Sequence, residues 1–303
     1  MRRPEDWDKR VKTPTSFHFL KFNRLNLERA IGVEKIKKMA EKYPSTFYHY
    51  TSVSSLFKIL DCKTLGNEIS IKFSNTMQTN DPKEVHFFKN YVFNDTKSGE
   101  KMNSLKSQLG FNKEPFSFSL IHHYEGNEEK LFGRKGYPHC EIPMWSMYGD
   151  KFKGVRLKFD AQELKAYIEG KPNFILKKCD YKTISEMREI GKEIRTKFRN
   201  GSIDNEKLIS LYKNACFYKP FSWAYECEWR IACFVKCADK ICIDENNGKN
   251  YILTQLPLNC LKTIEIGPLA DYGQIRSSLS VLQEMYTQMK NVKIIKSNLQ
   301  VKY

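Results

Sequence analysis

The stretch Glu68-Ile-Ser-Ile-Lys-Phe-Ser74 alternates apolar and polar side chains, which is typical of a strand with one buried face. Further short strands are predicted at 46–50, 116–121, 154–159, 228–235, 263–266 and 292–295. Helices are predicted between them at 53–60, 161–169, 184–217 (in two pieces split at 200–201) and 271–289. Strands and helices do not alternate strictly, and no Gly-x-Gly-x-x-Gly follows a strand, which disfavours a doubly wound dinucleotide fold. The pattern predicts an α+β fold with mixed, largely antiparallel split sheets and flanking helices.

The chain has 303 residues, and we expect two parts. Residues 1–45 are predicted to be an N-terminal helical extension, with a helix over Leu27–Lys42 that Pro44 ends. Residues 46–303 are predicted to form a single α+β domain of catalytic type.

The composition predicts a cytoplasmic protein with no membrane partner. No stretch approaches the roughly 20 apolar residues of a membrane span, and the first seven residues lack the apolar core of a signal peptide. The nine cysteines are odd in number and include no Cys-x-x-Cys pair, so we expect free thiols rather than a disulfide framework.

The formal net charge is +16, from 51 basic and 35 acidic residues. Such an excess favours polyanionic partners through long-range attraction, so nucleic acid is one predicted partner. A basic composition also arises without any such role, and charge alone does not decide between the two.

Tyr48-His49-Tyr50-Thr51 lies at the end of a predicted strand. His49 and Thr51 are two positions apart and would share one face of an extended chain, where they could bind a sugar together. Alternatively, His49 is a core histidine satisfied by the backbone, and Thr51 caps the next helix.

Met144-Trp145-Ser146-Met147-Tyr148-Gly149 precedes another predicted strand. An aromatic residue beside glycine can form a stacking platform for a flat heterocycle. The alternative is a hydrophobic anchor for a loop.

Tyr225-Glu226-Cys227-Glu228-Trp229-Arg230 enters a late strand, where the three charged residues would line one face. In a functional site, such a carboxylate pair would stabilise a developing sugar cation and orient a nucleophile. On a solvated face, Arg230 would pair with a carboxylate and contribute at most about 1 kcal/mol.

No metal site is predicted, because His122, His123, His139 and Cys140 match no common zinc spacing. No Gly-x-x-x-x-Gly-Lys-Ser/Thr loop is present either, which excludes phosphoryl transfer of the P-loop kind.

Several of these motifs, in this order, resemble a bacterial family, domain-of-unknown-function family 2971. They are Tyr48 to Ser52, Phe73 to Asn75, Asn80 to Glu84, Met144 to Gly149, Gly154 and Tyr225 to Arg230, and the strand at Ile264 to Gly267 also resembles the end of the family, so the resemblance spans about 47–268. The pattern of that family is in turn similar to ADP-ribosyltransferases of the His-Tyr-Glu type.

That second resemblance implies a fold in which NAD, as substrate, binds in a cleft between two small antiparallel sheets. It implies that His49 contacts the nicotinamide-side ribose, that Tyr148 stacks on the nicotinamide, and that Glu228, with Glu226 two positions before it, stabilises the oxocarbenium-like transition state. Further residues expected to bind NAD are Tyr50, Thr51, Ser117 and Trp145.

The implied function is NAD-dependent ADP-ribosyl transfer, by a toxin or phage-defence effector that modifies nucleic acid or protein and that has an antitoxin or another defence protein as partner. Two alternatives stay open. One is a non-catalytic nucleic-acid-binding module of stress or defence, and the other is a metal-dependent nuclease that uses Glu226, Glu228 and Asp81.

Overall fold

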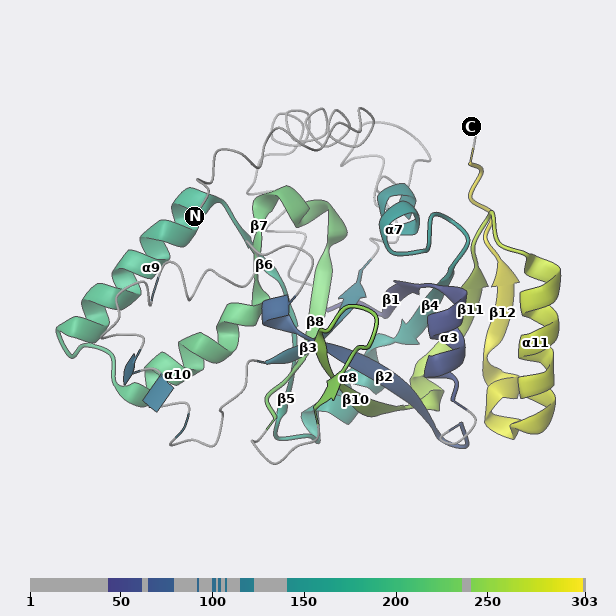
Figure 1. Ribbon diagram of the computed structural model, residues 1–303, viewed down its shortest axis with the longest axis horizontal. Coiled ribbons are helices and arrows are strands. Elements are labelled where there is room, and N and C mark those ends of the chain that lie inside the picture. The colour runs from purple at the N-terminus through teal and green to yellow at the C-terminus, as the bar shows by residue number, and fades with distance from the viewer. Residues whose placement is uncertain are drawn as a thin grey trace. The chain divides into compact units, whose positions relative to one another are not determined.

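The computed structural model describes residues 43–61, 65–78, 115–122, 141–235 and 241–301, and also positions 92, 100, 101, 103, 104 and 107 (Figure 1). All of these except Tyr43 belong to one compact unit, Pro44–His123 and Pro138–Tyr303. The predicted helix at Leu27–Lys42 lies outside the described residues.

One sheet of ten strands organises this unit, in the order β12-β11-β4-β1-β3-β2-β10-β9, with β8 paired to β3 and β5 paired to β8 (Figure 1). Their bounds are β1 Thr46–Thr51, β2 Glu68–Asn75, β3 Phe116–Ile121, β4 Val155–Asp160, β5 Phe174–Lys178, β8 Glu228–Cys233, β9 Cys242–Ile243, β10 Asn250–Pro257, β11 Leu261–Ile266 and β12 Lys293–Lys296. Every pair among them is antiparallel except β11–β12. A separate parallel pair joins β6 (Asp180–Lys182) to β7 (Tyr218–Pro220). The predicted α+β class with a mixed, largely antiparallel sheet is confirmed.

The sheet branches at β3. One edge of this strand pairs with β8 along its whole length, from Phe116 opposite Cys233 to Ile121 opposite Glu228. The other edge is shared, because β2 pairs at the Phe116 end and β1 pairs only at Ile121. The first residue of β8 therefore lies one strand away from β1.

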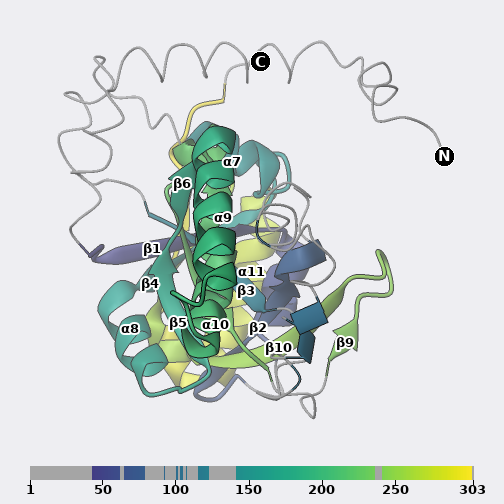
Figure 2. The ribbon, with the colours of Figure 1, turned by 90° about the vertical axis from the view of Figure 1, so that its left-hand side faces the viewer.

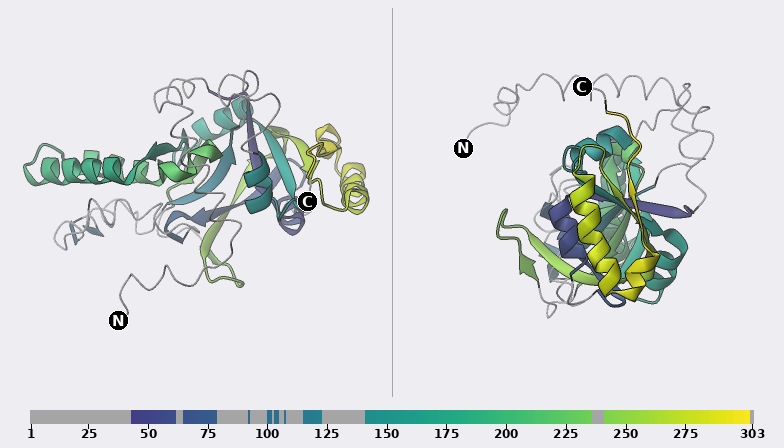
Figure 3. Two further views of the ribbon diagram at one scale, coloured as in Figure 1. Left: turned by 90° about the horizontal axis from the view of Figure 1, so that it is seen from above. Right: turned by 90° about the vertical axis from the view of Figure 1, so that its right-hand side faces the viewer.

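Six α-helices are present in the described part of the chain, namely α3 Val53–Ile59, α7 Glu141–Met147, α8 Ala161–Glu169, α9 Ile184–Arg199, α10 Asn205–Asn214 and α11 Tyr272–Met285. Figure 2 shows α9 running along the surface of the unit with α10 next to it, and Figure 3 shows α11 alongside β12. Side-chain caps begin most of them, including a capping box in which Thr183 and Glu186 exchange hydrogen bonds at the start of α9.

The two faces of β1 pack against different layers. Phe47 contacts the Trp229 ring on one face, with ring centroids 5.3 Å apart. On the other face, Tyr48 and Tyr50 join a buried cluster with Trp145 of α7. This alternation decides which side chains of β1 can reach the head of β8.

A buried arginine fastens α7 to the sheet. Arg156 of β4 donates to Glu141, the first residue of α7, at 2.6 Å, and its Nε donates to Glu265 of β11 at 2.9 Å. The same guanidinium donates to the Tyr50 hydroxyl on β1 and lies 5.9 Å from the Trp145 ring. Four elements thus meet at one side chain, and α7 is held against the face that carries Tyr48 and Tyr50.

The turn after α7 is held in an uncommon backbone conformation. Asp150, Lys151 and Phe152 all have positive φ, at 49°, 52° and 71°. For residues other than glycine, this conformation costs about 1–2 kcal/mol each. Backbone hydrogen bonds stabilise it, including Phe152 N–H to the Trp145 carbonyl and Gly154 N–H to the Gly149 carbonyl.

Most strands with clean alternation were predicted, and β3 and α8 match their expected bounds. The sequence missed α7, β5, β6, β7, β9 and β10. Residues along β5 and β10 are largely half-buried on both faces, so these strands lack the two-residue pattern on which the prediction depends.

Gly154→Ala tests this packing. An added Cβ would lie 2.2 Å from the Thr51 carbonyl oxygen and 2.8 Å from that of Gly149, and both are backbone atoms. We expect a loss of roughly 2–4 kcal/mol in the free energy of unfolding, measured by urea denaturation.

Gly170→Ala is the matched control, because its Cβ would approach no atom closer than 3.5 Å and Gly170 has φ −75°. It should leave stability unchanged or raise it by up to about 1 kcal/mol. Equal effects of the two substitutions would contradict the close backbone approach at Gly154.

Candidate functional site

Glu226 and Glu228 converge because the chain turns sharply between them. Glu226 ends the 3-10 helix η5 (Phe221–Glu226), and Glu228 begins β8. Cys227 between them is left-handed, with φ 47° and ψ 44°. The expectation that both carboxylates alternate along one strand is therefore wrong, although Glu228 and Arg230 do share a strand face.

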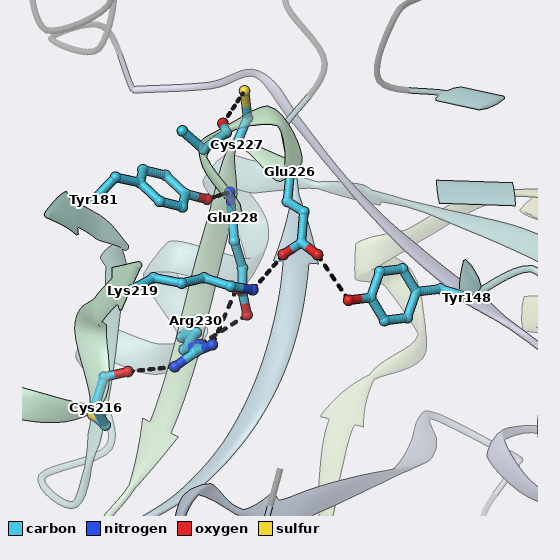
Figure 4. Close-up of polar contacts among 9 residues, drawn as sticks. Tyr148, Tyr181, Cys216, Lys219, Glu226, Cys227, Glu228 and Arg230 are labelled. Atoms are coloured by element: carbon cyan, nitrogen blue, oxygen red, sulfur yellow. Dashed lines mark hydrogen bonds and ion pairs between the residues drawn. The ribbon is translucent and has the colours of Figure 1, made fainter. Parts of the chain in front are cut away.

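The cluster around the two carboxylates is buried. Glu226, Glu228 and Arg230 expose 2 %, 1 % and 2 % of their surface, which overturns the solvated-face alternative. Figure 4 shows Lys219 of β7 reaching between the two glutamates, with Arg230 on the far side of Glu228. Two positive and two negative side chains thus share one site. Ionised groups buried to this degree need partners of opposite charge.

Both oxygens of Glu228 accept hydrogen bonds from cations. Arg230 Nε donates to Oε1 at 2.8 Å, and Lys219 Nζ donates to Oε2 at 2.5 Å. The Glu228 N–H donates to the Tyr181 hydroxyl at 2.7 Å, and Arg230 Nη1 donates to the Cys216 carbonyl at 2.6 Å. Burial alone would raise the pKa of Glu228, but the charges of Arg230 and Lys219 hold it well below its usual value.

Glu226 has the opposite electrostatic balance. Its Oε2 accepts a hydrogen bond from Lys219, and its Oε1 accepts one of 2.7 Å from the Tyr148 hydroxyl. Burial raises the pKa of Glu226, the charge of Glu228 raises it further, and Lys219 only partly opposes the change. Two neighbouring carboxylates whose pKa values are pushed apart are typical of sites that separate acid and base roles.

Tyr148 connects this buried cluster to solvent. It follows α7, its N–H donates to the Met144 carbonyl at 2.9 Å, and its side chain is 37 % exposed. Its ring is therefore available to a ligand while its hydroxyl contacts Glu226 (Figure 4). The predicted pairing of an aromatic residue with the late carboxylates is present, but it uses Glu226 rather than Glu228.

His49 is not brought into this cluster. Its Nδ1 lies 2.9 Å from the Ser119 carbonyl oxygen, to which it donates, and its ring lies 4.4 Å from that of Phe118. Burial lowers the pKa of His49 to about 4, so the imidazole is neutral at pH 7. The contact with the Ser119 carbonyl matches the alternative of a histidine satisfied by the backbone, and the side chain is half-buried rather than part of the core.

The strand register explains the position of His49. Tyr48 lies opposite Ile121, and Ile121 lies opposite Glu228, so these three residues cross the sheet in one row. Residues in such a row point to one face, and His49, one position along, points to the other.

Among the other residues predicted to bind NAD, Tyr50 and Trp145 belong to a buried aromatic cluster. Trp145 is fully buried and meets the Tyr50 ring edge-on at 5.1 Å, so it offers no face to a ligand. Ser117 is buried on β3 opposite Ala232. Thr51 ends β1, and the neighbouring Ser52, rather than Thr51, caps α3.

Lys219 and Tyr181 are central to the site, and the sequence did not indicate them. Lys219 is a single basic residue in the aromatic stretch Phe217-Tyr218-Lys219-Pro220-Phe221, and Tyr181 belongs to a three-residue strand. Lysine is rarely buried, whereas aromatic residues often are. A single lysine within an aromatic stretch is therefore the signal in the sequence that could have drawn attention to Lys219.

Within the described residues, no group of three or more His, Cys, Asp or Glu side chains could hold a metal ion. His123, His139, Cys140 and Asp81, which entered the zinc and nuclease alternatives, lie outside those residues. No helix in the same part of the chain is long and apolar enough to span a membrane.

Residues 144–231 match the model of a family described as "Protein of unknown function (DUF2971)". This segment is shorter than the span of the motif resemblance, and it contains Tyr148, Lys219, Glu226 and Glu228. No curated protein and no solved structure gives a significant match to the chain. The segment is similar to that family, which carries no assigned activity.

Proposed function

We propose that the protein is an NAD-dependent ADP-ribosyltransferase whose reacting centre is the pair Glu226–Tyr148. The observation that carries the proposal is the 2.7 Å hydrogen bond between the half-exposed Tyr148 and the buried Glu226, a carboxylate of raised pKa. Glu226 lies two residues before the late strand on which the resemblance expects the reacting carboxylate, and Glu226 and Tyr148 both belong to the segment matched by the family model.

The proposed chemistry begins at the bond between the ribose C1′ and the nicotinamide nitrogen of NAD. As this bond breaks, its electron pair leaves with nicotinamide, which departs neutral, and positive charge develops on the ribose. A fixed carboxylate beside that charge stabilises the transition state. An acceptor hydroxyl or amine then bonds to C1′ and gives its proton to Glu226, whose raised pKa makes it a stronger base than an exposed glutamate.

Glu228 has an anchoring role in this proposal. Two cations, Arg230 and Lys219, offset the negative charge of Glu228, whereas Glu226 has a single cationic partner, Lys219, so the charge of Glu226 is the less neutralised of the two. Glu228 fixes Lys219, which in turn positions Glu226. The cation-stabilising role that the resemblance gives to Glu228 therefore passes to Glu226.

The same contacts disfavour the metal-dependent nuclease. A divalent ion bound by Glu226 and Glu228 would have to displace two buried cations, Lys219 and Arg230. The toxin or phage-defence role, the antitoxin partner and the cytoplasmic location stay predictions, since no described contact bears on them.

Glu226→Gln tests the reacting carboxylate. The amide keeps the shape of the side chain and can still accept from Tyr148, but it carries no charge. Nicotinamide release from NAD by the purified protein should fall by about 100-fold or more. Glu163→Gln, which alters a half-exposed ion pair with Lys262, should leave the rate unchanged. Release at the wild-type rate by Glu226→Gln would remove the assignment.

The pH profile tests the link to Tyr148. Activity requires ionised Glu226, so kcat/KM should fall as pH drops through a pKa above the ordinary glutamate value. The Tyr148 hydroxyl donates to the charged form and lowers that pKa. Tyr148→Phe should therefore shift the acid limb of kcat/KM to higher pH. An acid limb that stays in place or moves to lower pH would contradict the contact.

His49→Asn tests whether His49 binds the ribose of NAD or only donates to the Ser119 carbonyl. An asparagine amide can still donate to the Ser119 carbonyl, so we expect a folded protein whose NAD turnover is within about threefold of wild type. His49→Ala should cost about 0.5–1.5 kcal/mol in unfolding free energy, because it removes the hydrogen bond to the carbonyl of the exposed Ser119. A folded His49→Asn variant with a 100-fold loss of turnover would restore the ribose-binding role of His49.

A further inference from the structure

A row of basic side chains runs along the exposed side of α9. Arg188, Lys192, Arg195 and Arg199 follow one another at spacings of four, three and four residues. At about 100° per residue, these four positions fall within about 60° of one another around the helix axis. Figure 2 shows α9 lying along the surface of the unit.

Burial agrees with the helical geometry. Arg188, Lys192 and Arg199 are exposed and Arg195 is half-buried, whereas the buried face of α9 consists of Met187, Gly191 and Ile194. The stripe is thus separate from the apolar face that packs against α10.

The other solvent side of α9 has a different charge pattern. Glu186, Glu189 and Glu193 lie there, and Glu193 forms an ion pair with Lys197. The glutamate side of α9 therefore contains an ion pair. In the basic stripe, by contrast, positive residues follow one another three or four positions apart. Like-charge neighbours at these spacings repel one another.

A second segment adds to this basic region. Lys101, far away in sequence, places its Nζ 4.7 Å above the ring of Phe198 on α9. Phe198 packs with the apolar face of α9 and points about 100° around the helix axis from Arg199, the last residue of the stripe. Lys101 thus adds positive charge near the C-terminal half of α9, beside the stripe rather than within it.

We propose that the basic stripe of α9 binds the sugar–phosphate backbone of a nucleic acid. Its length is about 16 Å at 1.5 Å per residue, which is roughly five base-pair steps of 3.4 Å. Three of its four members are arginines, whose planar guanidinium groups match phosphate oxygens in pairs. The net charge of +16 adds long-range attraction for the same partner.

A bilayer surface fits less well. Ile184 is the one large apolar side chain of α9 that is strongly exposed, and a helix that lies in a membrane interface needs a continuous apolar face. The binding proposal stands independently of the proposed NAD chemistry, because it involves none of the residues around Glu226.

The experiment compares two triple variants of equal net charge. Arg188→Gln/Lys192→Gln/Arg199→Gln removes the exposed members of the stripe. Lys165→Gln/Lys197→Gln/Lys290→Gln removes three lysines from outside the stripe, namely the half-buried Lys165 and the exposed Lys197 and Lys290, of which Lys197 lies on the other side of the same helix. Glutamine is a good helix former, and circular dichroism checks that both variants keep their helix content.

Affinity for labelled single-stranded RNA and duplex DNA is measured by fluorescence anisotropy between about 50 and 200 mM salt. The stripe variant should lose at least about tenfold in affinity, and its slope of log K against log salt should become shallower by up to about 3 for duplex, at about 0.9 per phosphate contact. The control triple should keep the wild-type slope.

Three results would overturn the proposal. Equal losses in the two triple variants would show that net charge alone binds. Absence of binding by the wild-type protein would remove the partner. Tighter binding to vesicles of anionic lipid than to nucleic acid, lost in the stripe variant alone, would assign the surface to membranes.

Discussion

The site depends on one buried interaction, the ammonium group of Lys219 held between the carboxylates of Glu226 and Glu228. Each of these ions would cost several kcal/mol to bury alone, and the cost is offset only because Arg230 supplies a second positive charge. Removing one partner of such a set typically costs about 3–5 kcal/mol, since a buried charge is left uncompensated. The cluster therefore fixes β7, η5 and the head of β8 relative to one another.

The same constraint produces unequal carboxylates. Arg230 and Lys219 donate hydrogen bonds to the two oxygens of Glu228. Glu226 accepts from Lys219 at one oxygen and from the neutral Tyr148 hydroxyl at the other. Burial raises the pKa of Glu226, because one cation does not offset it, whereas Arg230 and Lys219 together hold the pKa of Glu228 below its usual value. The left-handed Cys227 is what turns both side chains toward one lysine. The backbone turn thus brings the two carboxylates together, and burial and the neighbouring charges then set their pKa values. Tyr148 connects the buried cluster to solvent.

Local pattern predicted much of the fold and some of the site. Strands such as β3 have clean alternation, and the motif residues Tyr148 and Glu226 do meet. The role of Lys219 was not predicted, because its partners lie seven and nine positions ahead, on either side of a turn at Cys227 where the sequence pattern predicted a continuous strand. The placement of His49 failed for another reason. Its face depends on the register of Tyr48 opposite Ile121, and a shift of one residue would have reversed it.

The central claim is that NAD binds where Tyr148 meets Glu226, and an NMR titration of NAD into protein with labelled tyrosine and histidine rings tests it most directly. The account predicts saturable shifts of the Tyr148 ring, assigned by its loss in the phenylalanine variant, while the His49 ring is unperturbed. Shifts confined to His49, or no saturable shift at any ring, would contradict the account.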